Sequence, residues 1–107
     1  MNPQPLTPTF AVSPQITPTD IEALKAMGYR TLINNRPDDE EPGQPRSAEI
    51  ETAAHAAGLA YAHIPVAGSL TPEAVQATQA ALASLPQPIL AFCRSGARST
   101  YLFQAAQ

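Results

Sequence analysis

The sequence predicts an α/β fold: a mainly parallel central sheet of about four to five strands, flanked by helices. Short apolar segments alternate with helical patterns along the 107 residues, and this alternation is typical of parallel sheets. A chain of this length is typical of one domain with one hydrophobic core. We expect residues 1–9 to form an extended, proline-rich arm and residues 10–107 to form that single domain.

The N-terminal third begins with prolines and continues with a helix and a strand. Five of the twelve prolines lie within the first 18 residues, which excludes a long helix or a central strand there, because proline lacks a backbone donor. We expect residues 10–12 to form a short edge strand. Thr19 and Glu22 match a capping box, which predicts a helix that ends near Gly28. The β-branched and aromatic residues of segment 29–33 predict a buried strand.

The remaining elements follow in the same alternation. Segment 34–45 is a polar loop with prolines, and Ser47 is a candidate cap for a helix that ends at Gly58. Segment 59–66 is predicted to be the third strand. Thr71-Pro72-Glu73 has the residues typical of a helix start. That helix places a stripe of residues toward the core: Val75, Thr78, Leu82 and Leu85. The last predicted unit is a strand over 89–92 and a helix over 97–106.

Composition and charge exclude several functional classes. The net charge is -3, so the chain has no basic field to attract nucleic acid. No apolar segment approaches the roughly 18 residues that a membrane helix needs. A single cysteine forms no internal disulfide, which indicates a reducing compartment, and we expect a cytoplasmic protein. The two histidines and one cysteine lack metal-ligand spacing, so we expect no metal and no cofactor.

The only cysteine, Cys93, lies between the last predicted strand and the last predicted helix. Backbone N–H groups at a helix start are unpaired and carry the positive end of the helix dipole, so this loop can bind an anion. A cysteine there should have a lowered pKa and react as a thiolate. We expect Cys93 and Arg98 to be catalytic, and we expect five neighbours to bind the anion or substrate: Arg94, Ser95, Gly96, Ala97 and Ser99.

Two further loops follow the predicted strands and should meet the cysteine loop, because ligands bind beyond the carboxyl ends of parallel strands. One is segment 34–36, where Arg36 either binds substrate or pairs with the acids of its own loop. Asn34 and Asn35 are expected to brace loops, His63 to make a structural hydrogen bond, and the acidic run 38–41 to be a solvated loop tip. The other loop is segment 67–69.

The cysteine loop resembles the active loops of two enzyme classes. Cys93, Arg94, Gly96 and Arg98 form a Cys-Arg-x-Gly-x-Arg pattern that resembles the loop of rhodanese-type sulfurtransferases. Cysteine phosphatases use a similar loop that is one residue longer and is usually preceded by His. In this chain four residues separate Cys93 from Arg98, and Phe92 precedes the cysteine.

Nearly the whole chain also resembles the bacterial beta-lactamase-hydrolase-like family, through four motifs in order: segments 32–38, 41–45, 63–66 and 90–99. The resemblance implies a dual-specificity-phosphatase-like fold with a sulfur-handling or phosphatase-type site. Some relatives are fused to a metallo-β-lactamase-like domain that oxidises persulfides. The resemblance therefore implies a partner of that kind, a persulfide-oxidising protein of sulfide metabolism.

The choice between sulfur and phosphate rests on a general acid. Dual-specificity phosphatases typically carry an Asp in the loop after the His63–Val66 motif, and this chain has no carboxylate there before Glu73. Asp38 or Asp39 is an unusual substitute. A thiol leaving group needs less protonation than an alkoxide. We therefore expect a sulfurtransferase in which Cys93 takes sulfane sulfur from thiosulfate or a persulfide and passes it to a thiol or cyanide.

Two alternatives remain open from the sequence. A cysteine phosphatase would hydrolyse a phosphate ester through a phospho-Cys93 intermediate. A non-catalytic module would bind phosphate or sulfate through the same loop without turnover.

Overall fold

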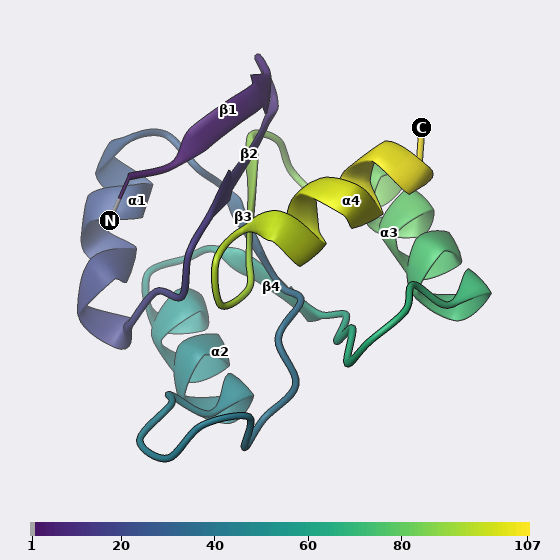
Figure 1. Ribbon diagram of the computed structural model, residues 1–107. Coiled ribbons are helices and arrows are strands. Elements are labelled where there is room, and N and C mark those ends of the chain that lie inside the picture. The colour runs from purple at the N-terminus through teal and green to yellow at the C-terminus, as the bar shows by residue number, and fades with distance from the viewer. Residues whose placement is uncertain (1) are drawn as a thin grey trace.

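The computed structural model describes residues 2–107 and shows one five-stranded sheet with helices on both faces (Figure 1). The strands are β1 (Gln4–Thr7), β2 (Phe10–Ser13), β3 (Thr31–Asn34), β4 (Ala60–His63) and β5 (Ile89–Phe92). Their order across the sheet is β1-β2-β5-β3-β4. Only β1 is antiparallel to its neighbour, and the other three pairings are parallel. The predicted α/β fold with a mainly parallel sheet is confirmed.

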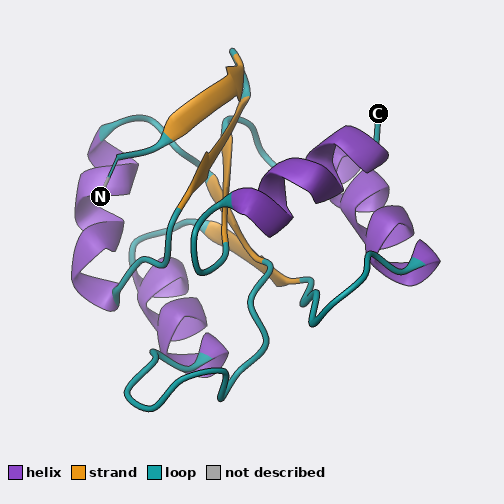
Figure 2. Cartoon of the chain, viewed as in Figure 1, coloured by secondary structure: helices purple, strands orange, loops and turns teal. Residues whose placement is uncertain are grey.

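Four α-helices and one short 3-10 helix cover the described sheet (Figure 2). They are η1 (Pro18–Asp20), α1 (Ile21–Ala26), α2 (Ser47–Ala56), α3 (Pro72–Ser84) and α4 (Ala97–Ala105). Helices α1 and α2 pack on one face of the sheet, and α3 and α4 pack on the other. None of the helices within residues 2–107 is long and apolar enough to cross a membrane.

Strand β5 is the centre of the molecule because it pairs with β2 on one side and β3 on the other. All four of its residues are buried. Leu90 and Phe92 pack against the α1–α2 face, and Ile89 and Ala91 pack against the α3–α4 face, since successive side chains of a strand point to opposite faces. A strand buried on both faces reads as a continuous apolar run, which is how this segment was predicted.

The parallel register aligns the carboxyl ends of four strands. Ser13 of β2 and Asn34 of β3 both lie beside Phe92 of β5, and Asn34 also lies beside His63 of β4. The loops that follow these residues therefore leave the sheet at the same edge. This edge carries the cysteine loop.

The N-terminal segment differs from the prediction in one respect. Strand β2 was expected at the edge of the sheet, but β1 pairs along its outer side, so β2 is an interior strand and all four of its residues are buried. Pro5 lies in β1, where an edge strand tolerates a residue without a backbone donor. The expected arm over residues 1–9 thus includes Gln4–Thr7, which extends the sheet.

Two helix starts were placed wrongly. The first helical segment begins after Thr17, not Thr19, and the Thr17 N–H donates to the Asp20 carboxylate at 2.8 Å. Helix α2 follows Arg46, not Ser47, and the Arg46 N–H donates to Glu49 at 3.2 Å. In both cases a carboxylate accepts the backbone N–H of the residue three positions before it. The predicted helix starts therefore lie one or two residues too far along the sequence.

Other boundaries agree more closely. The Thr71 hydroxyl accepts the Ala74 N–H at 3.1 Å, which confirms the predicted start of α3. The strands predicted over 29–33 and 59–66 are shorter in the structure, where β3 covers Thr31–Asn34 and β4 covers Ala60–His63. Of the stripe expected on α3, Thr78 is buried, and the larger side chains are half-buried at the rim of the core.

A substitution in β5 tests the importance of this central strand. Leu90 has no exposed surface, so we expect Leu90→Ala to lower the free energy of unfolding by about 2–5 kcal/mol through lost burial and a residual cavity. Equilibrium unfolding in urea measures this loss. Tyr101→Ala is the control, because Tyr101 is largely exposed and should change stability by about 0.5 kcal/mol or less. Equal effects of the two substitutions would contradict the assignment of β5 as the core strand.

Candidate functional site

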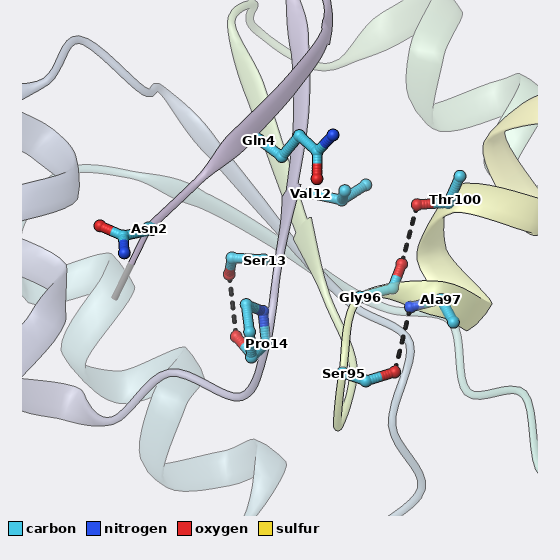
Figure 3. A pocket seen from close by; sticks show the side chains of 9 residues that line it. All are labelled: Asn2, Gln4, Val12, Ser13, Pro14, Ser95, Gly96, Ala97 and Thr100. Carbon is cyan, nitrogen blue, oxygen red and sulfur yellow. Dashed lines mark hydrogen bonds between the residues drawn. The ribbon is translucent and has the colours of Figure 1, made fainter.

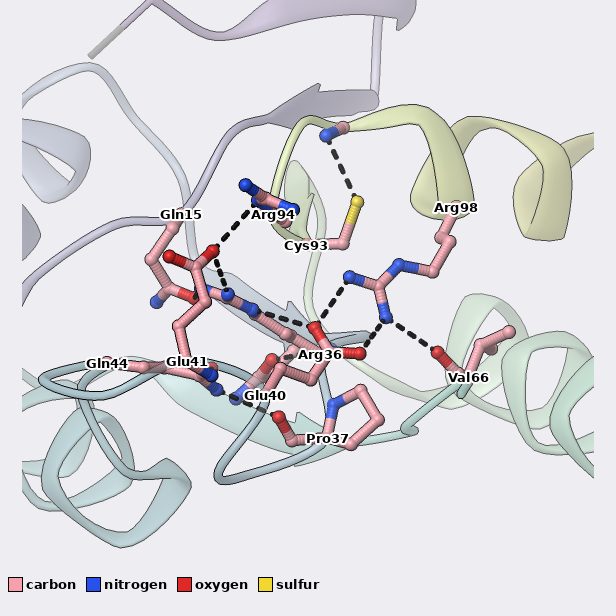
Figure 4. A network of polar contacts seen from close by, with 12 residues as sticks. Gln15, Arg36, Pro37, Glu40, Glu41, Gln44, Val66, Cys93, Arg94 and Arg98 are labelled. Carbon is pink, nitrogen blue, oxygen red and sulfur yellow. Dashed lines mark hydrogen bonds and ion pairs between the residues drawn. The ribbon is translucent and has the colours of Figure 1, made fainter. Parts of the chain in front are cut away.

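Three loops converge at the carboxyl edge of the sheet and bring one thiol, three guanidinium groups and two carboxylates together (Figure 4). Cys93 and Arg94 follow β5, and Arg98 lies in the first turn of α4. Arg36 follows β3 and shares its loop with the two acids, Glu40 and Glu41. The loop after β4 contributes a backbone carbonyl.

The turn from β5 into α4 places a backbone amide on the cysteine sulfur. The Gly96 N–H donates to Cys93 Sγ over 3.0 Å (Figure 4). Gly96 has a φ of 96°, a left-handed conformation that glycine adopts at little cost. A Cβ at this position would lie 3.5 Å from the Ser13 carbonyl of β2, an ordinary contact distance, so the backbone angle rather than space favours glycine. Gly96 thus adopts at little cost the conformation in which its amide points to the sulfur.

Burial and hydrogen bonding act in opposite directions on the Cys93 thiol. The side chain has no exposed surface, and burial alone raises the pKa of a thiol. Backbone amides of Ser99, Ser95 and Gly96 favour the thiolate, and together they hold the pKa of Cys93 below its usual value. The Ser99 hydroxyl is itself buried and makes no hydrogen bond within residues 2–107. The geometry thus supports a thiolate.

Arg98 lies beside the sulfur and is held in place by two neighbours. Its Nη1 donates to the Val66 carbonyl at 2.8 Å and to Glu40 at 2.7 Å, and its Nη2 donates to Glu40 at 2.8 Å. Glu40 raises the pKa of Arg98 most, burial lowers it, and the charge of Cys93 adds to the rise. Arg98 is therefore a fixed cation next to the thiolate.

Arg36 is the buried centre of the charged network, with a side chain only 4% exposed. Its Nε donates to Glu40 at 2.9 Å, its Nη2 to Glu41 at 2.8 Å, and its Nη1 to the Gln15 side chain at 3.1 Å. Of the two roles considered for Arg36, the structure shows the pairing with its own loop. Arg94 is 69% exposed and contacts Glu41 through Nε at 2.8 Å.

The acidic run 38–41 is exposed from Asp39 to Glu41, as expected for a solvated loop tip, but its acids also form ion pairs. Glu40 and Glu41 pair with Arg36, whereas Asp39 pairs with Arg46 at 3.0 Å. Asp38 accepts the Ser47 N–H at 2.8 Å. Both aspartates considered as general acids therefore interact with residues at the end of their own loop rather than with Cys93.

Glu40 is ionised in this arrangement. Hydrogen bonding from Arg98 lowers the pKa of Glu40 most, burial raises it, and hydrogen bonding from Arg36 lowers it further. The pKa of Glu40 falls to about 2 as a result. A carboxyl group that has already lost its proton cannot donate one to a leaving group. Glu40 therefore supplies no general acid in this state.

Two hollows lie on either side of the cysteine loop. The first, of about 300 Å³, is lined by the charged network: Arg36, Glu40, Glu41, Arg94 and Arg98. The second, of about 400 Å³, lies between the N-terminal segment and the start of α4 (Figure 3), and its lining includes Gln4, Ser13, Ser95, Gly96 and Thr100. Cys93 lines neither hollow, so a substrate reaches the sulfur only when a neighbouring side chain moves.

Only some of the predicted site residues interact with the Cys93 sulfur. Gly96 and Ser99 act on the sulfur, and Arg98 lies next to it. Ser95 offers its backbone amide to Cys93 while its hydroxyl accepts the Ala97 N–H at 3.3 Å. Sequence reasoning missed Glu40 and Gln15. Only the excess of acids beside Arg36 hinted at Glu40, and nothing local indicated Gln15.

The polar residues at the ends of β3 and β4 brace the loops, as predicted. The Asn35 side chain donates to the Ile64 carbonyl at 2.8 Å, and the Asn34 side chain accepts the Arg36 N–H at 2.9 Å. His63 Nε2 lies 2.9 Å from the Arg36 carbonyl.

Within residues 2–107, no group of three or more His, Cys, Asp or Glu side chains is arranged to hold a metal ion.

Comparisons with known proteins agree on the family and the fold. The family model described as beta-lactamase hydrolase-like protein, phosphatase-like domain, matches residues 4–107. A beta-lactamase hydrolase-like protein of Agrobacterium fabrum is 42% identical over 96 residues, which is 89% of this chain and 22% of that relative. The chain thus spans less than a quarter of the length of this curated relative.

Two solved structures resemble the chain as a whole. A Neisseria meningitidis protein provisionally described as a phosphatase has a TM-score of 0.85 and 33% identity, over 94% of this chain and 72% of that one. A mutant form of Tk-PTP has a TM-score of 0.66 and 13% identity, over 97% of this chain and 77% of that one. The second likeness shows the fold alone.

The lowered pKa of Cys93 predicts a distinctive pH dependence of alkylation. Because a lowered pKa extends the thiolate form to lower pH, we expect the iodoacetamide rate at Cys93 to fall less steeply between about pH 8 and about pH 6 than the rate of an ordinary thiol. The rate for the same chain unfolded in guanidinium should fall roughly tenfold per pH unit. Mass spectrometry of quenched samples measures both. Parallel slopes for the folded and unfolded chains would contradict an activated thiolate.

The lowered pKa of Glu40 predicts a pH-dependent contribution to stability. A carboxyl group whose pKa is depressed in the folded state stabilises the fold above its unfolded pKa, and that stabilisation is lost as the pH falls through the folded pKa. The pKa is lowered from 4.5 to about 2. Glu40 lies at the surface, so solvent screens its ion pairs, and we expect Glu40→Gln to cost about 1 kcal/mol at neutral pH, with the loss shrinking between about pH 5 and about pH 2.

Urea unfolding at several pH values measures this contribution. Glu51→Gln is the matched control, because Glu51 is an exposed carboxylate on α2 and should show a small effect at every pH. A loss from Glu40→Gln that stays constant down to about pH 2 would show that Glu40 does not stabilise the fold through its charge.

Proposed function

Since the chain belongs to the family described as beta-lactamase hydrolase-like protein, phosphatase-like domain, we propose that it is a phosphatase-type hydrolase with Cys93 as its nucleophile. The observation that carries the proposal is the hydrogen bond from the Gly96 amide to the Cys93 sulfur, with Arg98 alongside. A thiolate, a ring of amides and a fixed cation are what covalent transfer of an oxyanion requires.

The proposed reaction has two steps. The Cys93 thiolate attacks phosphorus, an S–P bond forms, and the P–O bond to the leaving group breaks so that the leaving oxygen takes the electron pair. Water then attacks the phosphocysteine, the S–P bond breaks, and inorganic phosphate and the Cys93 thiolate are released. In both steps, loop amides and Arg98 stabilise the charge on the phosphate oxygens.

The state of the acids limits the substrate class. Glu40 is ionised, with a pKa of about 2, and Asp38 and Asp39 are engaged in their own loop. A leaving oxygen that receives no proton must itself be a weak base. We therefore propose aryl phosphates and other esters of acidic hydroxyl groups as the preferred substrates, and we expect alkyl phosphates to react slowly.

A second candidate function is the sulfur transfer that the sequence indicated, and the ionised state of Glu40, the carboxylate paired with Arg98, favours it. The thiolate would attack the sulfane sulfur of thiosulfate or a persulfide, the S–S bond would break, and sulfite or a thiolate would leave with the electron pair. The Cys93 persulfide would then pass its sulfur to a thiol or cyanide. Thiolate and sulfite leaving groups need little protonation.

The two candidates imply different partners. A sulfurtransferase would need a small anionic donor and a thiol acceptor, and a persulfide-oxidising protein of sulfide metabolism would use its product. A phosphatase would need only a phosphate ester and water. The third possibility, a module that binds phosphate or sulfate without turnover, would keep the anion loop and show neither reaction.

Parallel assays with p-nitrophenyl phosphate, with thiosulfate and cyanide, and with glutathione persulfide discriminate among these functions. We expect hydrolysis of the aryl phosphate, and a rapidly quenched sample whose Cys93 has gained one phosphoryl group in its intact mass. A gain of one sulfur atom from thiosulfate, with no hydrolysis, would support the second candidate and contradict the first.

Two substitutions assign the roles of the residues. Cys93→Ser should lower aryl phosphate hydrolysis by about 10³-fold or more, because the nucleophile is lost. Arg98→Lys should lower it by roughly 10- to 100-fold, because an ammonium group lacks the planar fork of the guanidinium. Arg46→Lys is the matched control at an exposed ion pair. Unchanged hydrolysis in Cys93→Ser would exclude the proposed mechanism.

A further inference from the structure

Arg36 is the only charged side chain among the buried polar residues of segment 2–107. Taking a charge out of water is costly, and a buried ion pair often stabilises a fold no more than apolar residues of similar size do. Stability alone therefore does not account for Arg36. We propose that Arg36 is a positioning residue of the anion site: it fixes Glu40, and Glu40 holds Arg98 with its free edge toward Cys93. This inference rests on the proposed function, in that it takes Arg98 to bind the oxyanion of the substrate.

Arg98 keeps two donors for a ligand. Its Nη1 group donates to the Val66 carbonyl at 2.8 Å and to Glu40 at 2.7 Å, and its Nη2 group donates once to Glu40 at 2.8 Å. The Nε hydrogen and the second Nη2 hydrogen make no hydrogen bond within residues 2–107, and Figure 4 shows this edge on the side of Cys93. Two parallel N–H groups match two oxygens of an oxyanion. An oxyanion can therefore bind Arg98 while Glu40 stays in place.

The direction of this free edge depends on Glu40. A guanidinium group is planar, so the contacts of Glu40 with Nη1 and Nη2 determine which way the opposite edge of Arg98 points. Glu40 itself lies in a loop at the surface. Arg36 holds it there, because Arg36 Nε donates at 2.9 Å to Oε1, the same oxygen that accepts from Arg98 Nη2. Figure 4 shows the carboxylate between the two guanidinium groups.

Arg36 is in turn held by several neighbours. Its side chain also donates to Glu41 at 2.8 Å and to Gln15 at 3.1 Å, and its backbone N–H donates to the Asn34 side chain at 2.9 Å. The Gln15 N–H donates to the Arg94 carbonyl of the cysteine loop at 3.3 Å. Arg36 therefore connects the acidic loop with the loops that follow β2 and β5.

These contacts transmit direction rather than charge. Without the contact from Arg36, Glu40 would keep its negative charge, but its carboxylate could turn among several rotamers. Arg98 would then keep its positive charge and lose its fixed orientation. Bidentate binding needs both free donors aimed at the ligand at once. A substitution of Arg36 that keeps the net charge should therefore still weaken anion binding.

The test measures the binding of inorganic phosphate to Arg36→Lys by isothermal titration calorimetry at about pH 8, with chloride keeping the ionic strength constant. Lysine keeps the charge, but one ammonium group cannot replace three directed contacts. We expect this variant to bind phosphate roughly 5- to 20-fold more weakly than the natural chain does. Arg46→Lys is the matched control at an exposed ion pair, and it should change the affinity by about twofold or less.

A double-mutant cycle tests whether Arg36 acts through Glu40. In the Glu40→Gln background the carboxylate that links Arg36 to Arg98 is already absent. We therefore expect Arg36→Lys to weaken phosphate binding by about twofold or less in that background. A general effect of Arg36 on the site would instead produce the same loss in both backgrounds.

Two measurements keep this test separate from a loss of folding. Urea unfolding and the calorimetric stoichiometry show what fraction of each variant is folded during the titration. Glu40→Asp is the second variant in case Arg36→Lys does not fold. It keeps the charge and moves the carboxylate away from Arg98, so we expect it to weaken phosphate binding roughly 3- to 10-fold. Glu51→Asp, at an exposed position on α2, is its control.

Several results would overturn the inference. Natural affinity in folded Arg36→Lys, or in Glu40→Asp, would show that the pair only stabilises the fold. Equal losses in both backgrounds of the cycle would show that Arg36 does not act through Glu40. A natural chain that binds no phosphate at millimolar concentration would have no anion site for Arg36 to prepare. By contrast, the expected losses of binding in a chain that hydrolyses no ester would support the role of Arg36 and refute only the hydrolase assignment.

Discussion

The hydrogen bond between the Gly96 amide and the Cys93 sulfur is the contact on which the site depends. It is possible because β5 ends at Phe92 and α4 begins at Ala97, with Gly96 in a left-handed conformation between them. The strand that leads into this turn is buried in the centre of the sheet and paired on both sides. The central, buried strand thus leads directly into the turn that holds the thiol, which is the arrangement that a preorganised anion site needs.

The same sheet explains how the charged groups converge on the thiol. Parallel register aligns the ends of β3, β4 and β5, so Arg36, the Val66 carbonyl and Arg98 meet although they lie far apart in the sequence. Arg36 is buried and paired with two carboxylates. Glu40 and Glu41 thus offset much of the charge that the three arginines bring to the neighbourhood of the cysteine.

The sequence predicts the central elements well because their signals are local. The apolar run of β5, the cysteine loop and the start of α3 at Thr71 can each be recognised within a few residues. Long-range features could not be predicted in this way. The pairing of β1 with β2 depends on tertiary register in a segment rich in proline. The contact between Glu40 and Arg98 joins residues 58 positions apart, and no local pattern shows which way an acidic loop will turn.

A crystal structure of the protein with bound tungstate tests most directly whether the cysteine loop is an anion cradle. Tungstate is a tetrahedral dianion that resembles phosphate and scatters X-rays strongly. We expect it to lie over the Cys93 sulfur and to accept hydrogen bonds from the loop amides and Arg98. An ion bound only outside the loop, with no contact to the loop amides, would contradict the account.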